Sequence, residues 1–497
     1  MKRGMVSNDD RTVNGAAVTR DGLLGSKGLW FAVWGSMAVV AAIIALEPRS
    51  VLSGRAGSLL SVALAVGAIV QFTTPLTFLT RKERSLTAIV CALFCVGQVE
   101  QRWTTSHSQV DFSAYYVAGG LASEKPTGQL YFQAEFPDGR IKVFPSGELN
   151  GWLGVEYRGV SASTAFLYPP LFAVFMKPFA RMSFSSAYAV WTEITVICGI
   201  ASLWLSLGFA ERKSNLTMMI PLVVGLFSYY PFYQELQLGQ TGAVILLTWA
   251  LGIWLFFRHS TWRSAFFFAL ATMIKITPIL AIPLMAFYRK WRWLIAYCCW
   301  ILVLLGFSVW QVGWAAHVQF AKRLLPSISC GVPVAGNTSI ISYVQELFLR
   351  YVPLLGSLPE NLPPLACSIS KIVAVLVYVT CIARFYLGRR ELDLIRLLVL
   401  TMLISLLISP ISWWHHYTIA LLPFIYLWNE KRESGRELLL SISVLIIGTN
   451  IAGFAIILLN HGWFQLVAAG IVPCLTVALV YFGASGKSVE RGGLESA

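Results

Sequence analysis

The stretch WLIAYCCWILVLLGFSVW, residues 293–310, contains no charged side chain and follows the basic cluster at 289–292. A helix of this length can cross the hydrocarbon core of a bilayer, which is about 30 Å thick. Apolar runs of the same kind recur along almost the whole sequence. The stretch therefore predicts a membrane protein whose spanning segments are helices.

The composition supports the same class. Of 497 residues, 57% are hydrophobic and only 12% are charged, far from the balance of a soluble domain. The net charge of +14 resides in short clusters between apolar runs, which is typical of topology signals and not of a nucleic-acid-binding face. We therefore expect an all-α integral membrane protein without nucleic acid as a partner.

The apolar runs predict a polytopic bundle of about fourteen transmembrane helices. The expected spans lie near residues 29–46, 57–79, 86–103, 166–182, 186–210, 216–234, 241–257, 264–288, 293–310, 364–387, 395–409, 415–428, 438–459 and 463–484.

Basic clusters give the orientation, because Lys and Arg favour cytoplasmic loops. The amino-terminal tail and the clusters at 81–84, 289–292, 389–390 and 431–432 all become cytoplasmic with this parity. Two further basic clusters then fall outside, which predicts a re-entrant or broken segment between 186 and 288. The protein is expected to be a multi-pass component of the inner (cytoplasmic) membrane.

This topology divides the chain into seven parts, with two large extracytoplasmic loops. They are a cytoplasmic tail at 1–28, transmembrane helices at 29–103, an external loop at 104–165, central helices at 166–310, a second external loop at 311–363, carboxy-terminal helices at 364–484 and a cytoplasmic tail at 485–497. No internal repeat of the kind found in many transporters is evident.

Asp111 is the most informative polar residue, because it stands just beyond an apolar stretch in QVDFSAYYVAGG. Tyr115 and Tyr116 follow by four and five positions, so one tyrosine would share a helical face with the carboxylate. Three roles remain open on these residues alone. Asp111 pairs with a cation, caps the helix beginning at Phe112, or accepts a proton from a substrate.

Two histidines stand where the segment SPISWWHHY begins a late helix on the external side. A histidine has a reference pKa of about 6.5, so His415 and His416 are expected to bind a phosphate or move a proton, or simply to line a wet interface. No carboxylate or cysteine stands at ligand spacing from them, and we expect no metal site.

Other polar residues interrupt apolar segments. Lys275 lies near the middle of one, where a charge is costly, and Glu193 is expected at similar depth as its ion-pair partner or neighbour in a wet cavity. Gln240 follows Gly239 at a predicted break, where its amide can bond freed backbone groups. The expected pair of Lys275 and Glu193 is as compatible with a structural role as with a catalytic one.

Two features of the loops leave alternatives open. Tyr168 begins the motif YPP, which reads as a helix start with an interfacial tyrosine and ties the first loop back to the membrane. Cys330 and Cys367 lie in or beside the second loop and can pair, although their spacing does not establish a disulfide.

Several short motifs stand in a characteristic order. They are DFSAYYVAGG at 111–120, LYF at 130–132, YPPLFAVFMKPFA at 168–180, LGQTGAVILL at 238–247, KITPILAIP at 275–283, GNTSI at 336–340 and SPISWWHHYTIALLP at 409–423. In this order and spacing, the sequence from about 105 to 430 resembles glycosyltransferase family 87. That family belongs to the GT-C superfamily of polytopic enzymes and includes mycobacterial mannosyl- and arabinofuranosyltransferases of envelope lipids.

The resemblance implies a GT-C type helical bundle that transfers a sugar from a polyprenyl-phosphate donor to a glycolipid or glycan hydroxyl, with inversion and no cofactor. It implies that Asp111 is the catalytic base and that His415 and His416 lie near the donor phosphate or the acceptor. We expect Arg323 and Arg350 to help offset the leaving phosphate.

Lys275 is a weaker candidate for offsetting that charge if it lies at mid-membrane. Further contacts to substrate are expected from Tyr115, Tyr116, Gln240 and Asn337. The predicted partners are the lipid bilayer, the donor and the acceptor.

Other classes of function fit part of the pattern. A flippase for lipid-linked saccharides would share the aromatic and basic residues but would not need Asp111 for sugar transfer. A polymerase or ligase of envelope glycans would carry more arginines in its external loops. A purely structural membrane protein would not need ionisable motifs gathered on one face.

Overall fold

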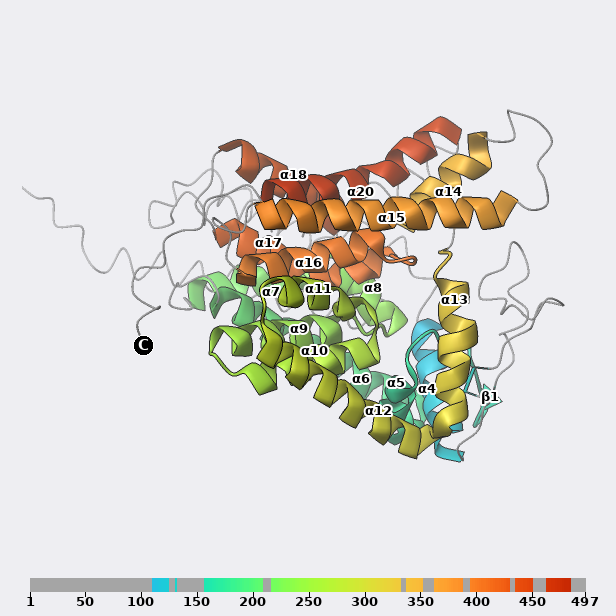
Figure 1. Ribbon diagram of the computed structural model, residues 1–497. Helices are drawn as coiled ribbons and strands as arrows, with labels where there is room; N and C mark the ends of the chain where they lie inside the picture. Colours follow the sequence, from blue (N-terminus) through green and yellow to red (C-terminus); the bar gives the residue numbers. More distant parts are fainter. Residues whose placement is uncertain are drawn as a thin grey trace, which may run out of the picture.

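The computed structural model describes residues 110–124, 130–131, 156–208, 216–331, 337–351, 362–387, 394–429, 434–449 and 462–483. Nearly all of these residues are helical, as the sequence predicts, and the helices are labelled as in Figure 1. The expected spans 29–46, 57–79 and 86–103 lie outside the described residues.

The helices of the first half surround the candidate site. They are α4 (Val110–Glu124), α5 (Pro170–Ala180), α6 (Phe184–Gly208), α7 (Leu216–Ser228), α8 (Tyr230–Leu238), α9 (Gly242–Phe257), α10 (Thr261–Ile274), the 3-10 helix η3 (Thr277–Leu280) and α11 (Ala281–Phe287). A small antiparallel hairpin joins β1 (Glu156–Tyr157) to β2 (Val160–Ser161) and packs against α4.

The second half begins with the longest of the described helices. Its elements are α12 (Trp291–Gln319), the π-helix η4 (Phe320–Leu324), α13 (Leu325–Ile328), α14 (Ile340–Tyr351), α15 (Leu362–Leu387), α16 (Leu394–Ile408), the 3-10 helix η6 (Trp414–Ala420), α17 (Leu421–Asn429), α18 (Ser434–Thr449) and α20 (Gly462–Gly483).

Three described helices are long and apolar enough to cross a membrane, namely α6, α12 with its extension to Lys322, and α15. Large apolar side chains stand exposed on all three, such as Trp204 on α6, Trp310 on α12 and Leu376 on α15. Exposed apolar faces of this kind suit contact with lipid. The number of about fourteen spans stays a prediction.

Several helices are interrupted. One of the breaks is predicted from the sequence, and another falls where the sequence predicts a continuous span. Between α8 and α9 the chain bends by 118°, so the expected broken or re-entrant segment between 186 and 288 is found there. The expected span 264–288 is also broken, because α10 ends at Ile274 and Lys275 is extended. Helix α12 continues beyond residue 310 and is kinked at Gly313.

The helices form layers around these interruptions (Figure 1). Helices α14, α15, α18 and α20 lie together on one side, α16 and α17 lie beneath them, and α9, α10 and α12 pack on the other side. Helices α4 and α5 pack closely together at one end, where a side chain on Gly119 would come within 2.5 Å of the Met176 carbonyl oxygen. The interrupted segments α8–α9, α10–η3 and α16–η6 meet between the layers and position the site.

Candidate functional site

Asp111 lies in the first turn of α4, and both of its carboxylate oxygens accept hydrogen bonds. Gln240 Nε2 donates to Oδ2 over 2.6 Å, and Thr164 Oγ1 donates to Oδ1 over 3.0 Å. The segment that carries Thr164 is itself attached to α4, because the Ser163 amide donates to Ser113 Oγ over 2.8 Å. Two elements distant in sequence therefore fix the direction of the carboxylate.

Two buried tyrosines contact the oxygen end of the Gln240 amide. The hydroxyls of Tyr115 and Tyr168 lie 2.9 and 2.8 Å from Gln240 Oε1 and 2.8 Å from each other. Because an ionised carboxylate can only accept hydrogen bonds, the amide nitrogen points to Asp111 and the amide oxygen accepts from the tyrosine hydroxyls. Tyr115 is the tyrosine four positions after Asp111, so the predicted shared face is confirmed.

Gly239 explains why Gln240 can reach α4. It adopts a φ of +73° at the end of α8, a conformation that costs little only for glycine. A Cβ at this position would also come within 2.5 Å of the Cβ of Phe112. Trp191 holds the turn from the other side, because its Nε1 donates to the Gly239 carbonyl over 2.9 Å.

The surroundings of Asp111 affect its ionisation. Burial raises the pKa of its carboxyl above the usual range, while hydrogen bonds from Gln240 and Thr164 and the positive charge of Lys275 act in the opposite direction. The helix begins at Val110 and both carboxylate oxygens bond to distant side chains, so capping does not account for the residue. The result is a basic carboxylate held in place by two hydrogen bonds and influenced by the positive charge of Lys275.

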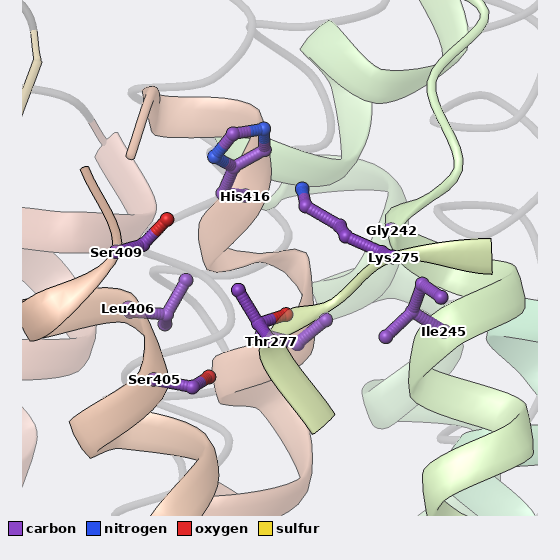
Figure 2. A pocket seen from close by; sticks show the side chains of 9 residues that line it. Gly242, Ile245, Lys275, Thr277, Ser405, Leu406, Ser409 and His416 are labelled. Atoms are coloured by element: carbon purple, nitrogen blue, oxygen red, sulfur yellow. The ribbon is translucent and has the colours of Figure 1, made fainter. Parts of the chain in front are cut away.

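Lys275 stands at the break between α10 and η3 and lines a pocket. The rest of the pocket is lined by Gly242 and Ile245 of α9, Thr277 of η3, Ser405 and Leu406 of α16, and Ser409, His416 and Ile419 after α16. Figure 2 shows the ammonium of Lys275 pointing toward the ring of His416, with the hydroxyls of Ser409 and Thr277 on the same pocket. A cation, an imidazole and hydroxyl donors in one pocket form a suitable environment for an anion.

The two histidines have different surroundings. His416 Nδ1 accepts a hydrogen bond from the Trp413 amide over 3.2 Å, so a neutral ring carries its proton on Nε2. His415 is buried, with its ring centre 4.5 Å from that of His416 and no hydrogen-bond partner for Nε2 among the described residues. Only His416 lines the pocket.

Asn337 links the second loop to the segment before the histidines. Its Oδ1 accepts from the Ser412 amide over 2.9 Å, and its Nδ2 donates to the Pro410 carbonyl over 3.2 Å. Thr338 adds a backbone bond to the Ser412 carbonyl over 2.8 Å. These contacts shape the turn that presents His416, and the expected contact of Asn337 with substrate stays a prediction.

The structure brings together Asp111, Tyr115, Gln240, Lys275 and His416 from the predicted set. The predicted use of the Gln240 amide for freed backbone groups is wrong, because the amide bonds Asp111 and the two tyrosines.

Tyr116 is buried on a different contact, because its hydroxyl donates to the Met182 carbonyl over 2.8 Å. Arg323 lies in η4 and Arg350 in α14, but their side chains lie outside the described structure.

The predicted pairing of Lys275 with Glu193 is wrong. Glu193 is exposed on α6, whereas the charges that act on Lys275 are those of Glu235 and Asp111. The expectation of equal depth assumed straight helices, and Lys275 instead stands at a break.

Sequence reasoning missed two residues of the site, Thr164 and Tyr168, and the neighbouring Glu235. Thr164 carries no distinctive signal, and Tyr168 reads as an interfacial tyrosine. Glu235 had a usable signal, because an acidic residue in an apolar segment is a functional candidate.

Cys330 and Cys367 form a disulfide with their Cα atoms 5.1 Å apart, so the pairing that the spacing left open is present. It ties the end of α13 to α15. Within the described ranges, no three His, Cys, Asp or Glu side chains are grouped closely enough to hold a metal ion.

Comparisons with known proteins agree with the motif order. The family model "Glycosyltransferase family 87" matches residues 166–410. The chain is 24% identical over 259 residues to the polyprenol-phosphate-mannose-dependent alpha-(1-2)-phosphatidylinositol pentamannoside mannosyltransferase of Mycobacterium tuberculosis, and the alignment covers 51% of this chain and 56% of that protein. Residues 166–410, which include Gln240 and Lys275, therefore match glycosyltransferase family 87, and the resemblance expected from the motif order is confirmed.

Proposed function

We propose that this chain is a membrane glycosyltransferase that moves a sugar from a polyprenyl-phosphate donor to the hydroxyl of a glycolipid or glycan. The family match supports the reaction class, and the printed name of the mycobacterial relative supports a polyprenol-phosphate-linked mannose as the first donor to test. The observation that carries the proposal is the Asp111 carboxylate, which hydrogen bonds from Gln240 and Thr164 hold in place and on which the positive charge of Lys275 acts.

In the proposed reaction, Asp111 accepts the proton of the acceptor hydroxyl. The hydroxyl oxygen forms a bond to the anomeric carbon as the bond from that carbon to the phosphate oxygen breaks, which inverts the configuration. Polyprenyl phosphate leaves with the bonding electrons. A carboxylate whose pKa is raised by burial is a stronger base than an ordinary aspartate, which favours this role.

The pocket of Lys275 supplies groups for the leaving phosphate. Its ammonium and His416 Nε2 are the charged or polar donors, and the hydroxyls of Thr277 and Ser409 lie on the same wall. Donors fixed before the reaction stabilise developing negative charge without having to reorganise. Arg323 and Arg350 remain further candidates for this task.

We place the reaction on the extracytoplasmic side of the inner membrane. The distribution of basic clusters supports this orientation. The Cys330–Cys367 disulfide supports it independently, because structural disulfides persist mainly in oxidising compartments.

The test uses purified full-length protein in detergent or liposomes with polyprenyl-phosphate mannose, arabinofuranose and glucose, and compares the parent with Asp111→Asn. We expect the parent to transfer or hydrolyse one donor and the variant to lose about 10²- to 10⁴-fold in turnover. Glu193→Gln, an exposed Glu on α6, is the matched amide control and should keep parental activity. Lipid flipping by the parent without sugar transfer would favour the flippase alternative and reject the transferase.

A further inference from the structure

Glu235 is a buried carboxylate that the proposed reaction does not use. It lies at the end of α8, and its side chain has no exposed surface. A carboxylate removed from water is costly unless it forms hydrogen bonds, so its contacts indicate what it does.

Glu235 bonds both ends of the turn between α8 and α9. Its carbonyl oxygen accepts from the amides of Gly239 and Gln240, each over 2.9 Å, and its Oε1 accepts from the amide of Ala243 at the start of α9. Thr241 precedes α9 but makes no side-chain capping bond, so the Glu235 carboxylate caps this helix in its place.

The other carboxylate oxygen of Glu235 lies against the backbone of the same turn. A Cβ on Gly242 would lie 2.6 Å from Oε2, and the side chain of Thr418 in η6 also interacts with the carboxylate. The carboxylate therefore occupies the space that a side chain at position 242 would need. Glycine at this position and glutamate at 235 fit each other.

The turn that Glu235 closes carries the amide that holds Asp111. Gln240 Nε2 lies 2.6 Å from the Asp111 carboxylate, and the Gln240 amide donates a hydrogen bond to the backbone carbonyl of Glu235. A shift of this turn moves the Gln240 side chain relative to both Asp111 and the two tyrosines. Small displacements of this kind lower turnover more than they weaken substrate binding.

We propose that Glu235 is a positioning residue for sugar transfer, whose side chain closes the turn at 239–243 and thereby holds Gln240 on Asp111. The inference rests on the proposed function, because its readout is the transfer reaction. It assigns the hydrogen bond to Ala243, and not the negative charge of Glu235, as the decisive contact.

The first test compares two variants of Glu235. Glu235→Gln keeps an oxygen that can accept from Ala243, so its kcat should stay within about threefold of the parent. Glu235→Leu removes the acceptor, and its kcat should fall about 10- to 100-fold with little change in the KM for the donor. Equal losses in both variants would show that the charge matters and would overturn the proposal.

The second test asks whether Glu235 acts through Gln240. Gln240→Leu removes the hydrogen bond to Asp111, and the double variant with Glu235→Leu should lose little more than the larger single loss. Losses that multiply would mean that the two residues act independently, which contradicts the inference.

Gly242→Ala perturbs the same contact without changing Glu235 and serves as a second variant if Glu235→Leu does not fold. It should lower kcat and leave the KM for the donor nearly constant, because the added Cβ displaces the carboxylate. Because Gly242 also lines the Lys275 pocket, this loss supports the proposal only if it does not add to that of Gln240→Leu. Parental kcat in a folded Gly242→Ala protein would count against the role of Glu235 in closing the turn. A parent that transfers no sugar at all would reject the proposed function, whereas an active parent with insensitive variants would reject only the role of Glu235.

Discussion

Replacement of Gly239 by alanine tests whether the turn before α9 sets the position of Asp111. The φ of +73° at this residue costs a non-glycine residue about 1–2 kcal/mol. The new Cβ would also stand 2.5 Å from the Cβ of Phe112, whereas carbon atoms in contact are separated by about 3.5–4.0 Å.

Relief of this overlap requires a displacement of about 1 Å between the turn and α4. Overpacking of this kind adds about 1–3 kcal/mol, which gives a total of about 2–5 kcal/mol. Because Phe112 follows Asp111 directly, the displacement moves the carboxylate relative to Gln240. A misplacement of about 1 Å costs on the order of 10²-fold in turnover.

The assay measures kcat and KM for the donor in purified Gly239→Ala protein, together with its thermal unfolding. Gly306→Ala is the matched control, because a Cβ at that position of α12 meets no atom within 4 Å. We expect a loss of about 10²-fold in kcat for Gly239→Ala and none for the control. A folded Gly239→Ala protein with kcat within threefold of the parent would refute the reasoning.

Three further predictions follow from the site and the loop. The base must be ionised, so activity should fall as the pH drops through the raised pKa of Asp111. Gln240→Leu removes a hydrogen bond to the charged carboxylate and should move this limb of the pH profile of kcat/KM to higher pH. An unmoved limb would contradict the assigned contact. Lys275→Gln should lower kcat about 10- to 100-fold in the same transfer assay, and parental kcat would remove Lys275 from the phosphate pocket. Alkylation and peptide mapping of denatured, unreduced protein should leave Cys330 and Cys367 unmodified until a reductant is added, and free thiols at both positions would exclude the disulfide.

The helical elements were largely predictable, because long apolar runs bounded by charge clusters mark them directly. The expected segment 241–257 corresponds to α9, Gly242–Phe257, and 395–409 corresponds to α16, Leu394–Ile408. The interruption at Lys275 was not predicted, because an apolar run shows the length of a segment and not its breaks. Pro278 was the available signal, since proline cannot donate a backbone hydrogen bond.

The candidate site was predictable only in part. Asp111 and Tyr115 could be paired from a spacing of four residues, because both stand on one helix. The contact between Asp111 and Gln240 joins residues 129 positions apart and depends on a glycine turn whose direction no local pattern specifies. Glu235 differs, because an acidic residue in an apolar segment marks it as a candidate, but its partner amide in the following helix could not be read from the sequence.

The bend of 118° between α8 and α9 also changes the electrostatics of the pocket. An unbroken helix would carry its backbone dipole past this point, but here α9 begins at Gly242, which lines the pocket. The first amides of a helix together act as roughly half a positive charge. The break thus adds a fixed partial charge that no side-chain substitution removes, and the buried Glu235 carboxylate, which accepts from the Ala243 amide in the first turn of α9, offsets it.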